Sequence, residues 1–244
     1  MKYLVCVDDT DMPGTEGTGR LVQRMCHLLA RETKALCSAI TRHQLYVHED
    51  IPFTSHNSAM CFEATLRERP GRFIRLMGDF LEKNSEKGSD PGLCLACLDH
   101  GLDEKALIQY GKKAKITVSS KEKAYDLAQK TGVFLSEHGG TGQGVVGAIA
   151  GVGLRLSGND GRYRGWHVLG RPGDIFKVAE LCQYPFIDGL VHVSGRVLGL
   201  NHHVGIGHEK TKTVRLGGRR MVVVREDETG TGLRTITPKE AKSY

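Results

Sequence analysis

The sequence predicts an α+β protein, on three observations. Short apolar runs alternate with stretches of helical apolar spacing through the first hundred residues or so. From about residue 186 the composition shifts to Val, Gly, Arg and His, which is typical of short strands and tight turns. The 244 residues are 39% hydrophobic and 25% charged, as in a globular protein with a substantial core.

The first predicted unit covers residues 1–102. Its expected elements are a strand over 2–7, a helix over 17–32, strands over 36–45 and 58–66, a helix over 71–84, and a strand over 91–98. Both helices space apolar residues three and four apart, whereas the strand over 58–66 alternates apolar side chains. The order β-α-β-β-α-β is that of a ferredoxin-like unit.

Two further segments are expected after it. Residues 103–185 predict a second α/β unit, with two helices around a short strand over 114–119, a small-residue helix over 146–154, and a strand over 163–170. Residues 186–244 predict a small basic β-rich segment, with strand structure over 190–200 and a hairpin turning on Gly217 and Gly218. The tail after Arg225 is expected to be loosely ordered.

The seven cysteines are scattered and mostly lie in apolar runs, which favours reduced core thiols over disulfides. In a strand, Cys94 and Cys97 would point to opposite faces and would not share a metal. No apolar run approaches the roughly 20 residues that span a bilayer, and the N-terminus turns acidic too early for a signal peptide. We therefore expect a cytoplasmic protein without a membrane partner.

The stretch VCVDDTDMPGTEGTGR places Asp8, Asp9 and Asp11 at the end of the first apolar run. Three like charges so close repel one another unless a cation holds them, and carboxylates are ligands for Mg²⁺. A helix opening at Thr18 would present free N–H groups to a phosphate. Capping of the turn is the alternative, but it accounts for one of the three carboxylates more readily than for all.

The stretch EHGGTGQGVVGAIAG contains Gly142-x-Gly144-x-x-Gly147, which matches a dinucleotide-binding fingerprint. A glycine-rich turn that enters a helix could cradle an anion, so Gly140, Gly142 and Gly144 are candidate phosphate-binding residues. Close packing of small residues explains Gly147 without any ligand. A third candidate stretch, TSHNS, offers His56 and Asn57 either to a substrate or to a turn.

Positive charge gathers in residues 196–225. Seven Lys and Arg residues stand there against one acid, together with three His, and the chain as a whole has a net charge of +6. Such a segment attracts phosphate groups of nucleotides or RNA, although a solvated sheet face is the alternative.

Together these stretches resemble the N-terminal half of the archaeal tRNA-isoleucine agmatinylcytidine synthetases (TiaS), over roughly residues 1–170. That family opens with a strand, Asp-Asp-Thr-Asp and a threonine at a helix start, to which Asp8, Asp9, Thr10, Asp11 and Thr18 are similar. Its Pro-aromatic stretch ending in Asn resembles residues 52–57. Its Asn-Pro-Gly strand entry and Gly-Arg-Gly helix resemble residues 90–92 and 142–148.

The resemblance implies ATP- and Mg²⁺-dependent activation of a nucleotide or small-molecule acceptor, as in tRNA modification by a transferase or ligase. It implies catalytic roles for Asp8, Asp9 and Thr18, metal binding by Asp8, Asp9 and Asp11, and cofactor binding by Thr10, His56, Asn57, Gly140, Gly142 and Gly144. RNA is an expected partner through residues 196–225, and a homodimer is left open. Where the family has basic residues, this chain has Thr54, Ser55, His56, Gly139, Gly140 and Gln143, which leaves a non-catalytic nucleotide- or RNA-binding module as the alternative.

Overall fold

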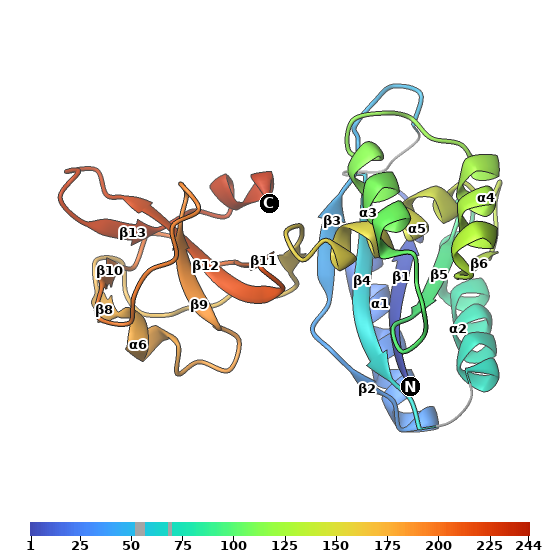
Figure 1. Cartoon of the computed structure of the whole chain (residues 1–244), viewed down its shortest axis with the longest axis horizontal. Helices are drawn as coiled ribbons and strands as arrows, with labels where there is room; N and C mark the ends of the chain where they lie inside the picture. Colours follow the sequence, from blue (N-terminus) through green and yellow to red (C-terminus); the bar gives the residue numbers. More distant parts are fainter. Residues whose placement is uncertain (52–56, 68–69) are drawn as a thin grey trace. The chain divides into compact units, whose positions relative to one another are not determined.

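The computed structural model describes residues 1–51, 57–67 and 70–244 and confirms the α+β class (Figure 1). The chain forms two compact units, Met1–Ser157 and Gly158–Tyr244. This grouping differs from the three segments expected, because the helices and strand between residues 103 and 157 pack on the sheet of the first unit rather than forming a unit of their own. Among the described helices, none has the length and apolarity needed to cross a membrane.

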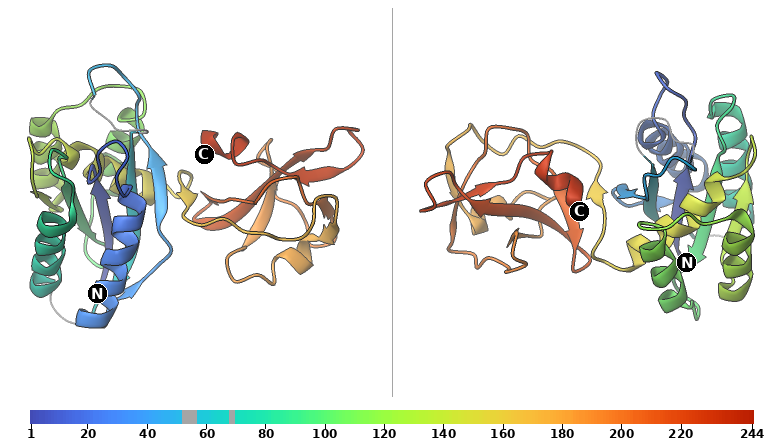
Figure 2. Two further views of the ribbon diagram at one scale, coloured as in Figure 1. Left: turned by 180° about the vertical axis from the view of Figure 1, so that it is seen from behind. Right: turned by 90° about the horizontal axis from the view of Figure 1, so that it is seen from above.

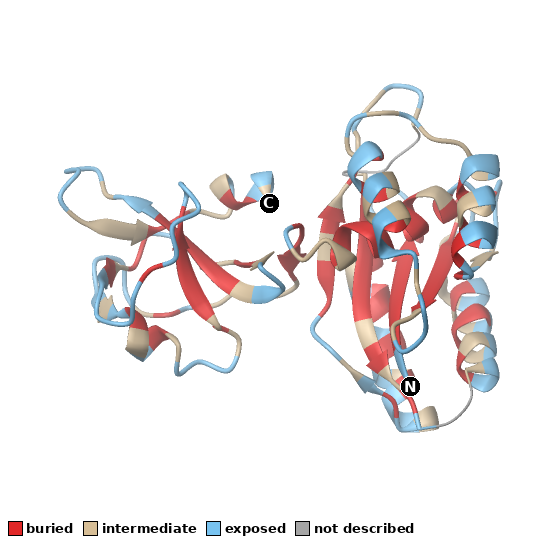
Figure 3. Cartoon of the chain, viewed as in Figure 1, coloured by how far each residue is buried: buried red, intermediate tan, exposed pale blue. Residues whose placement is uncertain are grey.

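The sheet of the first unit has the order β6-β5-β1-β4-β3, and every neighbouring pair is antiparallel. Its strands are β1 Lys2–Asp8, β3 Thr41–Gln44, β4 Ser58–Thr65, β5 Gly92–Cys97 and β6 Phe134–Glu137, and the short β2 Leu36–Cys37 also pairs with β4. In Figure 3 the central strands are buried along most of their length. A dinucleotide-binding fold needs parallel strands, so the fingerprint match does not indicate one here.

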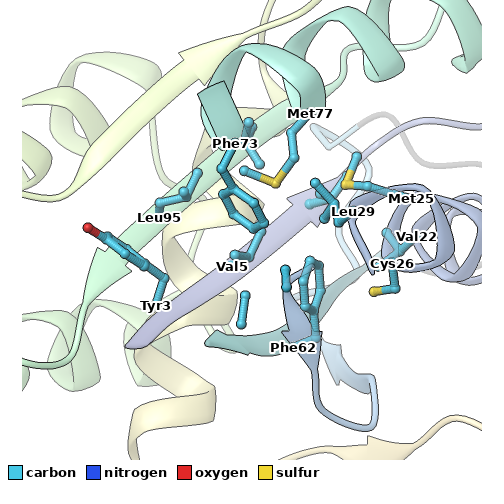
Figure 4. Close-up of a cluster of buried hydrophobic side chains, with 14 of the residues drawn as sticks. Tyr3, Val5, Val22, Met25, Cys26, Leu29, Phe62, Phe73, Met77 and Leu95 are labelled. Carbon is cyan, nitrogen blue, oxygen red and sulfur yellow. The ribbon is translucent and has the colours of Figure 1, made fainter. Parts of the chain in front are cut away.

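Helices α1 Thr18–Thr33 and α2 Gly71–Asn84 cover one face of this sheet. Because side chains alternate along β1, Tyr3, Val5 and Val7 point to this face. They pack with Phe62 and Phe73 in the buried cluster of Figure 4. The apolar side chains that the sequence spaces three and four residues apart thus form the packing face of both helices.

Helices α3 Glu104–Lys113, α4 Lys121–Thr131 and α5 Gly144–Leu156 pack with the other face (Figures 1 and 2). Leu4 and Cys6 of β1 point to it, and a Cβ on Gly151 would lie 2.4 Å from the Cys6 sulfur, so the helix backbone approaches the strand closely. The strand predicted over 114–119 is wrong. The N–H groups of Ile116 and Thr117 instead bond to the carbonyl of Lys113 and finish α3.

All seven cysteines are free, as predicted. Cys94 is buried on the α5 face of β5, whereas Cys97 packs against the opposite core. The two thiols therefore point apart and cannot share one metal ion.

The second unit is built mainly of short strands. They are β7 Arg162–Tyr163, β8 Ile175–Lys177, β9 Gly189–His192, β10 His203–Gly205, β11 Thr213–Leu216, β12 Arg219–Glu226 and β13 Leu233–Thr235, with helix α6 Val178–Leu181 and the 3-10 turn Glu240–Ser243. Strand β12 pairs with β11 and β13 antiparallel and with β9 parallel. The predicted hairpin is confirmed, with φ of +58° and +73° at Gly217 and Gly218.

Two expectations for this unit are wrong. The strands expected over 163–170 and 190–200 are much shorter, because bends and turns interrupt both segments. The tail after Arg225 is ordered rather than loose, since β13 pairs with β12 and the side chains of Ile236 and Ala241 are buried. Burial of these two apolar residues anchors the end of the chain on the unit.

Candidate functional site

The acidic turn begins at Asp8, the last residue of β1. Alternation along the strand points its side chain toward α5, where a Cβ on Gly147 would lie 1.6 Å from the carboxylate. Asp8 is only 7% exposed. Burial raises the pKa of this carboxyl well above its usual range, and the charges of Asp9 and Asp11 raise it further.

Asp9 turns the chain away from the strand with a φ of +54°, one of two non-glycine residues in the left-handed region among those described. Asp tolerates this conformation better than most residues, but the conformation is uncommon outside glycine. Residues that adopt it cluster at active and ligand-binding sites. Burial, together with the charges of Asp90 and Asp11, raises the pKa of Asp9 to about 6. A hydrogen bond from the backbone of Asp90 lowers this pKa and offsets part of the rise. The turn therefore concentrates negative charge.

The rest of the acidic turn is fastened to the start of α1. The Thr18 hydroxyl donates to Asp11 Oδ1 at 2.7 Å and accepts from the Thr10 hydroxyl at 3.1 Å. Thr10 is fully buried, so its role is to hold Thr18 rather than to touch a ligand. The Thr18 hydroxyl reaches the site with its proton directed to a carboxylate.

Arg42 of β3 is a positive group near this turn that sequence reasoning missed. Burial lowers the pKa of its guanidinium, and the negative charge of Asp11 opposes that shift. Its Nε donates to the Ser58 hydroxyl at 2.9 Å, which fixes the side chain on the sheet. Because Arg42 lies on a different strand, only the fold brings its charge to the acidic turn.

Asp90 ties the glycine-rich turn to the sheet. Its Oδ1 accepts from the N–H groups of Thr141 and Gly142, and its Oδ2 accepts from the Thr141 hydroxyl at 3.0 Å. Its carbonyl accepts from the N–H of Gly144 at 3.0 Å. The N–H groups of Gly142 and Gly144, two of the three glycines that the sequence offered to a phosphate, are therefore bonded within the protein.

The glycines of this turn are needed for two different reasons. Gly140 and Gly142 have φ of +57° and +77°, where a side chain would be strained. Gly144 begins α5, and a Cβ there would lie 2.0 Å from the carbonyl oxygen of Asp90. The glycines thus serve the turn and the close approach of α5 to the sheet.

A cavity of about 430 Å³ opens at the acidic turn, within the range of small-molecule sites. Four carboxylates contribute to its lining, those of Asp8, Asp9, Asp11 and Asp50. Apolar and hydroxyl groups come from the segments 45–51 and 114–120, among them Leu45, Ile51, Val118, Ser119 and Ser120. No Lys or Arg lines the cavity within the described ranges, so the side chains that line it carry only carboxylate charge.

Of the residues proposed from sequence, the cavity lining includes Asp8, Asp9, Asp11, Thr18, Asn57 and Gly144. Asn57 also closes the β3–β4 connection, with its amide donating to the Tyr46 carbonyl at 2.7 Å. Thr10, Gly140 and Gly142 do not line it. His56 lies outside the described residues. The loop over 114–120 had no ligand-binding signal in the sequence and was missed.

The donor set of the cavity suits Mg²⁺, because the buried carboxylate of Asp8 and the half-buried carboxylate of Asp9 are hard oxygen ligands beside further carboxylates. No group of three or more His, Cys, Asp or Glu side chains in the described part of the chain is arranged to hold a metal by itself. Mg²⁺ usually takes one or two carboxylates and completes its shell with water and phosphate. The residues therefore fit a metal that arrives with a phosphate.

The basic segment 196–225 carries less free charge than its sequence suggests. Arg220 pairs with Asp188 at 3.2 Å, and Arg225 pairs with Glu240 at 2.6 Å. Both acids lie outside the segment in sequence. A hydrogen bond from the backbone of Thr237, which contributes most, and those from Arg225 and Arg234 lower the pKa of Glu240 to about 2. The fold thus neutralises part of the predicted anion-binding surface.

Comparison with known proteins gives matches among solved structures alone. No family model and no curated protein matches the chain. The complex of TiaS with tRNA and ATP matches with a TM-score of 0.56 and 19% identity, covering 82% of this chain and 50% of TiaS. A tRNA fluorescent labeling enzyme matches with a TM-score of 0.55 and 19% identity, covering 77% of this chain and 46% of the enzyme.

Apo TiaS, a tRNA agmatidine synthetase, matches with a TM-score of 0.51 and 21% identity, over 63% of this chain and 35% of TiaS. The chain thus spans between a third and a half of the proteins it matches. At these identities the likeness is one of fold, and the resemblance predicted from the motifs is confirmed at that level.

Proposed function

We propose that the first unit binds a nucleoside triphosphate, ATP in the first instance, together with Mg²⁺. The bound nucleotide would activate a nucleotide or small-molecule acceptor by phosphoryl or nucleotidyl transfer. One observation carries the proposal: a nucleotide-sized cavity lined by four carboxylates and, among the described residues, no Lys or Arg. Such a cavity repels a free triphosphate, so the nucleotide must bind with its cation.

Each residue of the acidic turn has a role in this scheme. Asp8 and Asp9 would hold the metal, with Asp11 beside them. Thr18, whose hydroxyl donates to Asp11, would contact a phosphate of the nucleotide. Bound Mg²⁺ would supply neutralisation of charge on the phosphates as they react. Gly144 lets the start of α5 approach the cavity, whereas Gly140 and Gly142 act through the turn that Asp90 fastens.

The remaining lining suits a nucleobase. Leu45, Ile51 and Val118 offer apolar surface, and Ser119 and Ser120 offer hydroxyl groups that can bond to base or ribose. Phosphoryl transfer would join an acceptor oxygen to the γ-phosphorus and release ADP. Nucleotidyl transfer would join it to the α-phosphorus and release pyrophosphate.

The likeness of fold to TiaS, solved with tRNA and ATP, supports an ATP-using enzyme of RNA modification as the class. TiaS was solved with tRNA, but the chain spans only about half of TiaS. We therefore include a tRNA acceptor as part of the proposal. A second candidate is a nucleotide-binding module without catalysis. The absence of Lys and Arg from the described lining favours it, since phosphoryl transfer relies on positive groups around the phosphate.

Thermal unfolding with ATP, with and without Mg²⁺, tests the binding proposal. Mg²⁺ with ATP at 100 times its Kd should add about 2.7 kcal/mol of stability, and ATP in EDTA should add none. Asp8→Asn should abolish the Mg²⁺-dependent gain, whereas Asp79→Asn, which removes the same charge from the exposed face of α2, should keep it. Equal stabilisation by ATP in EDTA would overturn the proposal. Release of ADP or pyrophosphate on adding acceptor RNA separates the enzyme from the binding module.

A further inference from the structure

Two of the seven cysteines lie in contact although 11 positions separate them in the chain. Cys26 is on α1, and Cys37 is on the short strand β2. Helix α1 ends at Thr33, and Lys34, with a φ of +56°, turns the chain back toward the helix. The Cys37 sulfur consequently lies 4.0 Å from the carbonyl oxygen of Cys26, and the two thiols share a hydrogen bond.

The two thiols differ in how far solvent reaches them. Cys26 is 8% exposed and belongs to the buried cluster of Figure 4. Cys37 is half-buried, stands between the exposed residues Leu36 and Ser38, and packs against the same cluster. A reagent from solvent therefore meets Cys37 first, with the Cys26 thiol next to it.

The hydrogen bond between the thiols gives each sulfur a different state. It lowers the pKa of Cys37, against the opposing effect of burial. The same hydrogen bond, together with burial, raises the pKa of Cys26 well above its usual range. Cys26 is therefore the thiol that donates, and Cys37 is the sulfur that ionises more readily. Because the thiolate is the nucleophilic form of cysteine, the more exposed member of the pair is also the more reactive one.

The other five cysteines do not combine these features. Cys182 is half-buried, but burial raises the pKa of its thiol. Cys97 is also half-buried, and it shares a hydrogen bond with the Tyr3 hydroxyl rather than with a second thiol. The remaining three have fully buried side chains: Cys6, Cys61 and Cys94. An accessible thiol next to a second thiol is the arrangement typical of redox-sensitive cysteines.

We propose that Cys26 and Cys37 form an oxidisable dithiol, a modification site at which hydrogen peroxide converts the pair to a disulfide between α1 and β2. The Cys37 sulfur attacks one peroxide oxygen, so that an S–O bond forms, the O–O bond breaks and one water leaves. The Cys26 sulfur then attacks the Cys37 sulfur, so that the S–S bond forms and the hydroxyl of the sulfenic acid leaves as a second water. The two thiols lose two protons and two electrons in all, and the peroxide takes them up. The site does not rest on nucleotide binding.

Peptide mapping of the full-length protein tests the disulfide. Trypsin releases Cys26 within residues 25–31 and Cys37 within residues 35–42, so each peptide carries one cysteine. Reduced protein that is treated with a stoichiometric amount of hydrogen peroxide and then with N-ethylmaleimide should yield these two peptides joined, and dithiothreitol should separate them. The joined peptides should come from protein that stays monomeric in non-reducing electrophoresis. Recovery of the two peptides alkylated separately, or of Cys37 as sulfinic acid, would overturn the proposal.

Alkylation rates test whether the two thiols act as a pair. In the wild-type protein at pH 7.5, Cys37 should react with iodoacetamide about tenfold faster than Cys182. Cys26→Ala removes the hydrogen-bond donor and should slow Cys37 at least about threefold, whereas Cys26→Ser keeps a donor and should retain most of the rate.

The matched control is Cys182→Ala, which removes another half-buried thiol and should leave the rate of Cys37 unchanged. Circular dichroism confirms that each variant is folded, and the peptide map of the wild-type protein decides the question if a variant is not. The proposal is wrong if Cys37 reacts no faster than Cys182, or if a folded Cys26→Ala protein shows the wild-type rate.

Discussion

Replacing Asp9 by Asn should stabilise the protein in the absence of metal. Burial and the charges of Asp90 and Asp11 raise the pKa of Asp9 from 3.8 to about 6. Since one pKa unit corresponds to 1.36 kcal/mol, the ionised carboxylate costs at most about 3 kcal/mol, and about 1–2 kcal/mol after allowance for solvent screening of this partly exposed group. Asn removes the charge and tolerates the φ of +54° as well as Asp does.

The sign of the pH dependence follows from the raised pKa. Between about pH 4 and 6 the folded protein binds the Asp9 proton more tightly than the unfolded chain, so the free energy of unfolding falls as pH rises through this window. The advantage of Asp9→Asn should therefore be absent at pH 4, grow up to about pH 6 and stay constant above. Mg²⁺ competes with the same proton, so Mg²⁺-dependent ATP binding should strengthen over this range.

Urea unfolding from pH 4 to 8 in EDTA measures the difference. Asp79→Asn removes an equal charge from an exposed part of α2 and should show no comparable gain. An Asp9→Asn protein that is less stable than wild type at pH 7.5, or a difference that does not vary with pH, would show that the carboxylate stabilises the turn. The account of Asp9 as a carboxylate destabilised by burial and by neighbouring carboxylates would then be wrong.

Two further substitutions test the structure around this site and in the second unit. Gly147→Ala would place a Cβ 1.6 Å from the Asp8 carboxylate. It should lower the free energy of unfolding, measured in urea, by about 1–3 kcal/mol and weaken Mg²⁺-dependent ATP binding. Gly101→Ala, with open space around it, should change neither. Glu240→Gln should cost about 1–2 kcal/mol at pH 7 by urea unfolding, because Glu240 is then ionised and accepts from Thr237, Arg225 and Arg234. The pKa of Glu240 is lowered to about 2, so its stabilising effect is complete above about pH 5 and should disappear as pH falls toward 2; a constant difference over that range would contradict it.

Local patterns in the sequence predicted the parts of the fold that depend on neighbouring residues. Alternation along 58–66 and helical spacing over 71–84 gave elements that the structure confirms, and the strand end at Asp8 followed by a helix at Thr18 brought both residues to one cavity. The segment 114–120 was missed because it reaches the cavity only through the fold. Arg42 was missed because only the fold brings its charge near Asp11. A strand over 114–119 was also predicted, but the N–H groups of Ile116 and Thr117 bond to the carbonyl of Lys113 at the end of α3.

The free positive charge of residues 196–225 was also overestimated, because it was judged from the acids within that segment alone. Residues 196–225 contain one acid, yet Asp188 and Glu240 from outside the window pair with Arg220 and Arg225. In the same way, Asp90 was noted beside Pro91 and Gly92, but nothing in the sequence indicated that its carboxylate would take the N–H groups of the glycine turn. Both are long-range contacts, which a single sequence does not reveal.

The lining of the cavity has two parts that differ in how well they tolerate substitution. Around Asp8 the contacts are with backbone, because Gly92, Gly144 and Gly147 leave no side chain between α5 and the strand ends. Rotamers cannot relax there, so this part of the cavity is rigid and intolerant of substitution. The loop over 114–120 contributes side chains instead, with Val118 exposed at 43%. Ligand preference could therefore diverge by exchange of loop residues while the carboxylates keep their places, which makes this loop the natural target for redesigning what the protein accepts.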